Sequence, residues 1–215
     1  MLSCQVLHSR IANRMNFLAH AFLARDDADL LLGSMMGDFV KGPLDGRYAA
    51  SITRGLSLHR AIDTYTDAHA LVVRSRARVS ATRRRYAGIL IDLFYDHFLA
   101  QHWGDYATVP LAQFTASVYS TLLERRDLLP QRLQNIASNM ARTDWLGSYR
   151  DTTNVGIALD RIGTRLTRGN ALLDSVTELI ENYEGFEEDF RAFFPEVMRF
   201  AREYSYGHPR RNGHD

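Results

Sequence analysis

Three ionisable residues, Asp92, Asp96 and His97, lie within the otherwise apolar segment RYAGILIDLFYDHFLAQHW, residues 85–103. The two aspartates are four positions apart, so on a helix they share one face, and His97 lies one step round from Asp96. A carboxylate removed from water is costly unless it is paired, and two carboxylates on one face repel each other. A divalent cation resolves both problems, because it is itself the largest local charge in such a site. The segment therefore predicts a buried helix that contributes to a cation site.

Other segments supply residues of the same two types. His59, Asp63 and Asp67 follow one another at intervals of four along the predicted helix over 48–66 and just beyond it. Asp38 lies near the end of segment 28–40, and His20 ends the sequence NFLAH. Mixed aspartate and histidine ligands suit manganese, iron or zinc, whereas the lack of cysteine ligands argues against a closed structural zinc site. These residues predict a metal site enclosed between helices.

Each of these residues also has a simpler interpretation. Asp67 could cap a helix or turn, and Asp63 and Asp92 could form salt bridges with arginines such as Arg60. His20 taken alone is typical of a hydrogen-bonded core histidine. The combination of His-x3-Asp on one helix and Asp-x3-Asp-His on the next favours the metal site over these ion pairs.

Apolar residues recur mostly at helical spacing, with few glycines and prolines and no alternating strand pattern. Pro110 and Pro130 stand at positions that favour the first turn of a helix. The sequence therefore predicts an all-α, single-domain bundle of about eight helices, large enough to enclose a site. The predicted helical segments cover residues 15–24, 28–40, 48–66, 85–103, 110–126, 130–146, 154–168, 171–194 and 195–204, with the last two separated at Pro195.

The composition is that of an ordinary globular chain of 215 residues, with 46% hydrophobic residues, 24% charged residues and a net charge of +1. A single cysteine, Cys4, excludes an internal disulfide and fits a reducing, cytoplasmic location. No segment predicts a membrane span, and no apolar run at the start predicts a secretory signal. A clean helical pattern begins at Met15, so we expect residues 1–14 to be a loose extension, 15–206 the catalytic domain and 207–215 a flexible tail.

Four sequence blocks together resemble the acyl carrier protein phosphodiesterase family of Gram-negative bacteria. They are MNFLAH from Met15, GDFVKG over 37–42, LHRAIDTYTDAH over 58–69 and RYAGILIDLFYDHFLAQHW over 85–103. The resemblance implies an all-helical enzyme distantly related to the HD phosphohydrolases. Such an enzyme removes 4′-phosphopantetheine from the serine of holo-acyl carrier protein, with Mn²⁺ as the usual cofactor and Mg²⁺, Fe²⁺ or Co²⁺ as alternatives.

The resemblance also assigns roles by position. The expected metal shell is Asp38, His59, Asp96 and His97, with Asp63 and Asp92 as further ligands, orienting groups or a second metal site, and with His20 as an acid or a phosphate contact. A metal in this shell would lower the pKa of a bound water and withdraw charge from a phosphate oxygen, and a general acid would protonate the departing serine oxygen. Spacing does not settle which of Asp38, His20, Asp63 and Asp92 acts as acid, base or ligand.

An arginine-rich strip precedes the helix over 85–103, and its residues are Arg74, Arg76, Arg78, Arg83, Arg84 and Arg85. It could simply be a solvated face of a linker and a helix start. It could also bind the acidic carrier protein and direct its prosthetic arm toward the metal, a role that we predict for Arg74, Arg78, Arg83, Arg84 and Arg85. Nucleic acid fits less well, because the rest of the chain is balanced in charge and carries no recognisable nucleic-acid-binding motif.

The sequence alone leaves two other functions open. A related metal-dependent hydrolase would act on a small nucleotide or phosphate ester without a protein partner. A non-catalytic helical interaction protein would use the same acids and histidines only for ion pairs, and would bind no metal. The sequence predicts neither the number of metals nor the oligomeric state.

Overall fold

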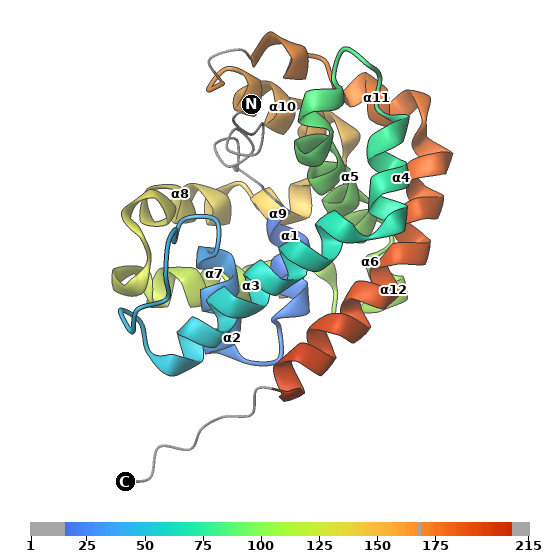
Figure 1. The fold of residues 1–215 in the computed structure, drawn as a ribbon. Coiled ribbons are helices and arrows are strands. Elements are labelled where there is room, and N and C mark those ends of the chain that lie inside the picture. Colours follow the sequence, from blue (N-terminus) through green and yellow to red (C-terminus); the bar gives the residue numbers. More distant parts are fainter. Residues whose placement is uncertain (1–15, 167–168, 208–215) are drawn as a thin grey trace, which may run out of the picture.

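The computed structural model describes residues 16–166 and 169–207. Over these residues it contains twelve α-helices, three 3₁₀ helices and no strand, which confirms the predicted all-α class (Figure 1). The predicted extension over 1–14 and residues 208–215 of the predicted tail lie outside the described residues. The α-helices are α1 (Phe17–Leu23), α2 (Ala28–Met36), α3 (Ala50–Ala68), α4 (Ala70–Arg78), α5 (Ala87–Gln101), α6 (Trp103–Tyr106), α7 (Leu111–Glu124), α8 (Gln131–Arg142), α9 (Trp145–Ser148), α10 (Thr152–Gly163), α11 (Val176–Glu181) and α12 (Tyr183–Gly207), and the 3₁₀ helices are η1 (Arg84–Tyr86), η2 (Arg126–Leu128) and η3 (Gly169–Leu172).

The count of twelve exceeds the expected number of about eight because α4 lies in the arginine-rich stretch, for which no helix was predicted, and because two further helices are very short. Helices α6 and α9 are four-residue turns that sequence periodicity is too coarse to detect. The segment predicted as one helix over 171–194 is divided into η3, α11 and the start of α12, with a turn at Asp174, whose φ is 55°. In the other direction, α12 continues through Pro195, where a break was expected, although a proline inside a helix removes one backbone hydrogen bond.

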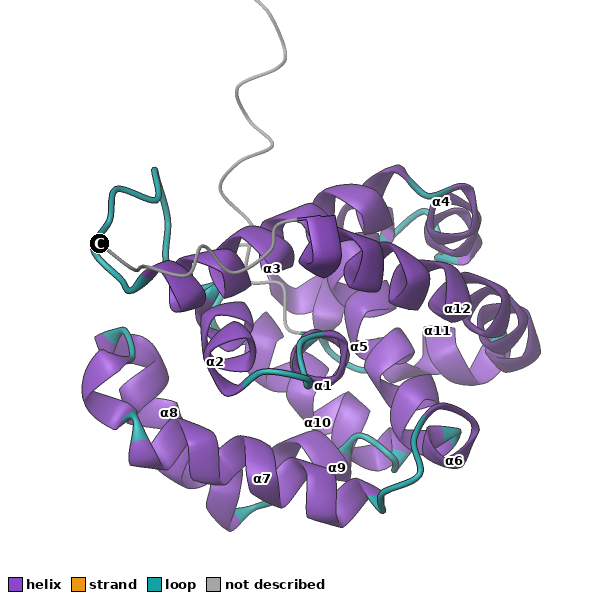
Figure 2. Ribbon diagram, turned by 90° about the horizontal axis from the view of Figure 1, so that it is seen from below, coloured by secondary structure: helices purple, strands orange, loops and turns teal. Residues whose placement is uncertain are grey.

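Helix α5 is the central element and is buried on all sides, as its uniformly apolar sequence predicted. It packs against α1, α4, α10 and α12. Seen from below, α3 and α12 lie on one side of α1, α2 and α5, and α7, α8 and α9 form a curved layer on the other (Figure 2). Asp92, Asp96 and His97 are all buried on α5, so the predicted polar groups do lie inside the core.

Helices α2 and α3 pack at unusually short range, because glycines meet where they cross. A Cβ atom added to Gly33 would lie 2.1 Å from the carbonyl oxygen of Ile52, and one added to Gly55 would lie 2.3 Å from that of Leu30. Only glycine permits this approach. The crossing brings the end of α2, followed by Asp38, against the middle of α3, which carries His59 and Asp63.

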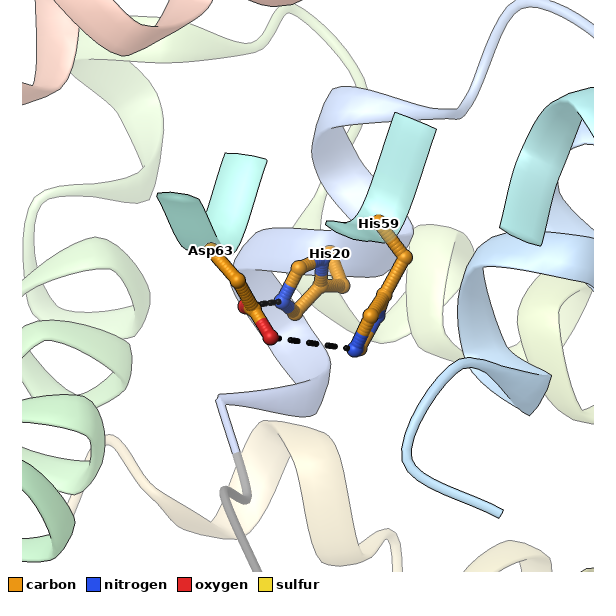
Figure 3. Close-up of side chains that lie close together, drawn as sticks. All are labelled: His20, His59 and Asp63. Carbon is orange, nitrogen blue, oxygen red and sulfur yellow. Dashed lines mark hydrogen bonds and ion pairs between the residues drawn. The ribbon is translucent and has the colours of Figure 1, made fainter. Parts of the chain in front are cut away.

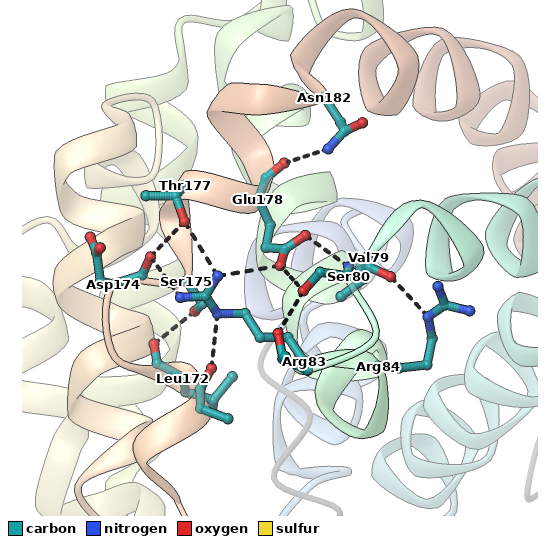
Figure 4. A network of polar contacts seen from close by, with 12 residues as sticks. Val79, Ser80, Arg83, Arg84, Leu172, Asp174, Ser175, Thr177, Glu178 and Asn182 are labelled. Carbon is teal, nitrogen blue, oxygen red and sulfur yellow. Dashed lines mark hydrogen bonds and ion pairs between the residues drawn. The ribbon is translucent and has the colours of Figure 1, made fainter.

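Two buried acids join the arginine-rich strip to the C-terminal part of the chain. Asp189 on α12 is fully buried and forms salt bridges with Arg74 and Arg78 of α4. Glu178 on α11 accepts hydrogen bonds from the backbone and side chain of Ser80 and pairs with Arg83 (Figure 4). These contacts fix α4 and the turn after it against α11 and α12. No helix in the described part of the chain is long and apolar enough to cross a membrane.

Candidate metal centre

His20 on α1 and His59 and Asp63 on α3 converge on one point (Figure 3). The Asp63 carboxylate lies between the two imidazoles, with Oδ1 at 3.2 Å from His20 Nε2 and Oδ2 at 3.5 Å from His59 Nε2. The two rings are stacked, with centroids 3.8 Å apart and planes inclined by 22°. His59 and Asp63 meet because they are one helical turn apart, as their spacing predicted. His20 joins them through the packing of α1.

Asp38 also lies beside His59, near the ring nitrogen that faces Asp63. Its Oδ1 is 3.9 Å from His59 Nε2, and both side chains are buried. The His59 ring also rests directly on Gly37, where an added Cβ atom would lie only 2.2 Å from ring carbons. The absence of a side chain at Gly37 therefore sets the position of the His59 ring, and with it the distance to Asp38.

Burial and neighbouring charges drive the pKa values of the two histidines apart. Burial alone would lower the pKa of His20, but the hydrogen bond and charge of Asp63, with the charge of Asp38 behind them, outweigh it and raise the pKa. Burial and then the charge of His20 lower the pKa of His59 to about 3, and Asp63 offsets only part of this effect. The surroundings therefore favour the charged form of His20 and the neutral form of His59, whose ring keeps one unprotonated nitrogen.

The arrangement fits a divalent transition-metal ion. One ligand atom from each of His20, His59 and Asp63 lies within 4.8 Å of the other two, so a single ion can contact all three. Two imidazole nitrogens and carboxylate oxygens are the donor set preferred by manganese, iron and zinc. The histidines are almost fully buried, whereas the Asp63 side chain is 22% exposed and forms the open edge of the cluster. In the described residues, His20, His59 and Asp63, with Asp38 beside them, are the predicted site residues that the structure brings together.

Asp96 lies outside this group and contacts the backbone of α1 instead. Its carboxylate accepts hydrogen bonds from the backbone N–H groups of Leu18 and Ala19, both at 2.9 Å. Asn16, the residue before α1, makes no side-chain cap, so Asp96 takes over this role from α5. Burial raises the pKa of Asp96 to about 7, although the two N–H donors act in the opposite direction. Its position is that of a group that holds α1, and hence His20, in place.

His97 also points away from the three-residue group. Its Nδ1 is 2.9 Å from the carbonyl oxygen of Tyr149, and its Nε2 is 2.9 Å from the hydroxyl of Tyr183. No spacing in the sequence indicates these tyrosines, which lie 52 and 86 residues further along the chain. Asp92 is buried one turn before Asp96, and its charge contributes to the raised pKa of Asp96.

The arginines predicted to bind a partner have contacts within the chain. Arg74 and Arg78 pair with Asp189, and Arg83 pairs with Glu178 and donates to the backbone of the segment after α10. Arg84 donates to the Val79 carbonyl oxygen, and the guanidinium of Arg85 lies 5.2 Å from the centre of the Tyr86 ring. Arg84 and Arg85 remain largely exposed. A docking role for the strip stays a prediction.

Comparison with known proteins identifies the family. The family model described as acyl carrier protein phosphodiesterase matches residues 15–197. A protein of that name from Serratia proteamaculans is 35% identical over 190 residues, which cover 88% of this chain and 98% of the relative. Proteins with the same name from Klebsiella pneumoniae subsp. pneumoniae and Escherichia coli are 36% and 33% identical, each over 87% of this chain and 97% of the relative.

No solved structure matches the chain, so the relation to the HD phosphohydrolases stays a prediction. The matched region begins at Met15, where the clean helical pattern begins, and it contains all four sequence blocks and every residue of the candidate metal centre. Because the match covers most of the chain and nearly the full length of these relatives, this protein belongs to the acyl carrier protein phosphodiesterase family.

Proposed function

We propose that the protein hydrolyses the phosphodiester bond between 4′-phosphopantetheine and the serine of holo-acyl carrier protein, giving apo-acyl carrier protein and free 4′-phosphopantetheine. The names of the relatives supply the substrate. The observation that carries the proposal for this chain is the convergence of His20, His59 and Asp63 at a partly open point in an otherwise apolar core. Ordinary packing does not require three ionisable groups there, whereas two imidazoles and a carboxylate can hold a divalent cation that assists the hydrolysis of a phosphate ester.

The cofactor in this proposal is Mn²⁺, held by His20 Nε2, His59 Nε2 and the Asp63 carboxylate. When bound, the ion supplies a Lewis acid that withdraws charge from the phosphate group. Asp63 orients both rings, because its two oxygens face the two Nε2 atoms. The proton that His20 holds at Nε2 must leave before this nitrogen can bind a cation, so binding releases a proton from the cluster.

The departing serine oxygen has to take up a proton. We assign this proton transfer to Asp38, the ionisable side chain of the cluster that is left once His20, His59 and Asp63 bind the ion. Its carboxylate would take a proton from the attacking water and pass it to the serine oxygen. Asp38 follows the end of α2, and its Oδ1 lies 3.9 Å from the same His59 Nε2 atom that Asp63 faces, which places it beside the proposed ion position. The surrounding buried residues exclude bulk water from this side of the cluster, which strengthens its electrostatic interactions.

The experiment is to incubate the purified full chain with Mn²⁺ and holo-acyl carrier protein and to follow the mass of the carrier protein. We expect a loss of mass equal to the phosphopantetheine group. Asp63→Asn should lower the rate by more than about 100-fold, since it weakens the contact with two ligand imidazoles at once. Asp67→Asn, one turn further along α3, should stay close to wild type, because Asp67 pairs with Arg76 outside the cluster.

Two results would contradict the proposal. One is the absence of any mass loss with Mn²⁺, Mg²⁺, Fe²⁺ or Co²⁺. The other is equal activity of Asp63→Asn and Asp67→Asn, which would show that the cluster takes no part in the reaction. Turnover of a small phosphate ester together with an unchanged carrier protein would favour the small-molecule hydrolase instead.

A further inference from the structure

Lys41 is the single lysine among the 26 lysine and arginine residues of the chain. It lies in the loop between α2 and α3, and its side chain is exposed (Figure 1). Within the described residues, its ammonium group forms no ion pair and no hydrogen bond. A lysine ammonium is a compact charge on a flexible stem, unlike the planar fork of an arginine. The one cation of this kind in the chain is therefore able to bind an anion from solution.

A second cation, Arg60, lies against the same part of the loop. Its Nη2 donates to the carbonyl oxygen of Val40 at 3.1 Å, and this carbonyl belongs to the peptide bond that precedes Lys41. Among the described residues, no carboxylate pairs with Arg60, and its remaining N–H groups have no partner. Two like charges at such close range repel each other. An anion that contacts both of them offsets this repulsion.

The position of Arg60 on α3 relates it to the metal centre. Successive residues of an α-helix are about 100° apart, so Asp63 lies about 40° from His59 and Arg60 lies about 100° from His59 in the same direction. The side chain of His59 is buried, whereas that of Asp63 is 22% exposed. The open edge of the cluster therefore faces the side of α3 that carries Arg60.

Lys41 also lies close to the cluster. Its charge is one of the causes, after burial and the charge of His20, that lower the pKa of His59 to about 3. Phe39, two residues before Lys41, stacks on Phe17 of α1 with ring centroids 6.1 Å apart. This contact holds the start of the loop beside the helix that carries His20. Lys41 and Arg60 thus provide two positive charges next to the metal centre.

The combination of groups favours a phosphate over other anions. A carboxylate presents two oxygens in one plane. A phosphate group presents oxygens in several directions, so it can contact a metal ion, an ammonium group and a guanidinium group together. Negative charge that develops on the phosphate during bond breaking is stabilised by cations already in place.

We propose that Lys41 and Arg60 form a phosphate-binding site beside the metal centre, in which they hold the phosphate group of the substrate. The inference rests on the proposed function for the identity of the molecule that carries the phosphate. The phosphate itself is inferred from two cations that have no acidic partner among the described residues and that lie beside the open cluster.

The first experiment measures phosphate binding without the reaction. The full chain is kept free of metal by a chelator, so that a metal ion cannot bind the probe, and inorganic phosphate binding is followed by ³¹P NMR. Lys41→Gln and Arg60→Gln should each weaken binding about tenfold, because each removes one hydrogen-bonding contact to a charged group. Lys41→Arg keeps the charge and should retain most of the binding.

Two matched controls separate this site from general surface charge. Arg47→Gln is the control for Lys41→Gln, because Arg47 is an exposed cation of the same loop that pairs with Asp45. Arg54→Gln is the control for Arg60→Gln, because Arg54 lies on the same helix about 120° round from Arg60. Neither control should change phosphate binding. Lys41→Gln should also unfold at the wild-type temperature, since Lys41 is exposed.

The second experiment measures the hydrolysis of holo-acyl carrier protein with Mn²⁺. Lys41→Gln should lower kcat about 100-fold, the effect of losing one group that stabilises developing negative charge, and should change KM much less. A lysine that bound acidic side chains of the carrier protein would instead raise KM and leave kcat unchanged.

The proposal is overturned if wild type binds no phosphate, or if Lys41→Gln binds phosphate as tightly as Arg47→Gln. It is also overturned if Lys41→Gln raises KM alone and leaves phosphate binding unchanged, because Lys41 would then contact the polypeptide of the carrier protein. If Lys41→Gln and Arg60→Gln weaken phosphate binding but wild type does not hydrolyse holo-acyl carrier protein, the proposed function is rejected and the phosphate site is supported.

Discussion

Replacing Asp96 tests whether a residue of α5 holds the helix that carries His20. Asp96→Ala leaves the N–H groups of Leu18 and Ala19 buried without a partner, and each such group costs about 1–3 kcal/mol. The expected loss in free energy of unfolding is therefore about 2–6 kcal/mol. Asp96→Asn keeps one acceptor and turns an NH₂ group toward the other N–H, so its expected cost is about half of that. Typical domains have about 5–15 kcal/mol in total, so the asparagine variant should remain folded.

The assay is urea unfolding at pH 8, above the pKa of about 7, where the Asp96 carboxylate is ionised and accepts both hydrogen bonds. Asp67→Asn is the control, because it removes a carboxylate from a partly exposed ion pair and should cost less than about 1 kcal/mol. Calorimetric titration with Mn²⁺ provides a second readout, which should show weaker binding in Asp96→Asn and unchanged binding in the control. If the two asparagine variants are equally stable and bind Mn²⁺ equally well, Asp96 does not hold α1.

Three further predictions follow from individual contacts. Gly37→Ala should weaken Mn²⁺ binding and lower the free energy of unfolding by about 1–3 kcal/mol, because the added Cβ would displace the His59 ring. The control is Gly104→Ala, which should change neither quantity, because an added Cβ there has no neighbouring atom within 4 Å. Equal effects of the two variants would contradict the contact between Gly37 and His59. In metal-free protein, the free energy of unfolding should fall by up to about 1.4 kcal/mol per pH unit as the pH drops from about 6.5 to about 3, since His59 binds a proton in the unfolded chain but not in the folded one. Urea unfolding at several pH values should show a weaker dependence of stability on pH for His59→Gln. The same pH dependence in both proteins would refute the lowered pKa of His59. Asp189→Ala should lower the free energy of unfolding by about 1–3 kcal/mol, because it removes the buried carboxylate that pairs with Arg74 and Arg78 of α4. The control, Asp105→Ala, removes an exposed ion pair and should cost less than about 1 kcal/mol. Equal thermal stability of the two variants would contradict a stabilising role for the contact between Asp189 and α4.

The sequence could predict contacts that depend on a single helix. The apolar composition of α5 predicted its burial, and the interval of four between His59 and Asp63 predicted that they share a face. The sequence placed residues of several helices in one predicted site, but it did not predict which side chains contact each other there. His20 meets Asp63 across 43 residues, through a helix crossing that no local pattern encodes. The expected number of helices was too low because α4 was not predicted, and because packing, rather than periodicity, sets where the short turns α6 and α9 form.

Asp96 and His97 show a second reason why the sequence did not predict every contact. They were expected to serve one metal shell, yet consecutive residues on an α-helix point about 100° apart. On a helix buried on all sides, both directions lead to polar partners, so burial alone does not say which partner each residue has. The structure directs Asp96 to α1 and His97 to Tyr149 and Tyr183. The assignment of Asp96 and His97 as ligands therefore remains a prediction.

The hydrogen bonds from Leu18 and Ala19 to Asp96 span 78 and 77 residues, and they have a consequence for biosynthesis. A ribosome makes His20, Asp38, His59 and Asp63 first, so all four cation-binding candidates emerge before the residue that secures α1. A nascent chain that ends before Asp96 contains His20, His59 and Asp63 but lacks the carboxylate that accepts hydrogen bonds from the first turn of α1. The first turn of α1 can therefore gain these two hydrogen bonds only after the central helix has been synthesised.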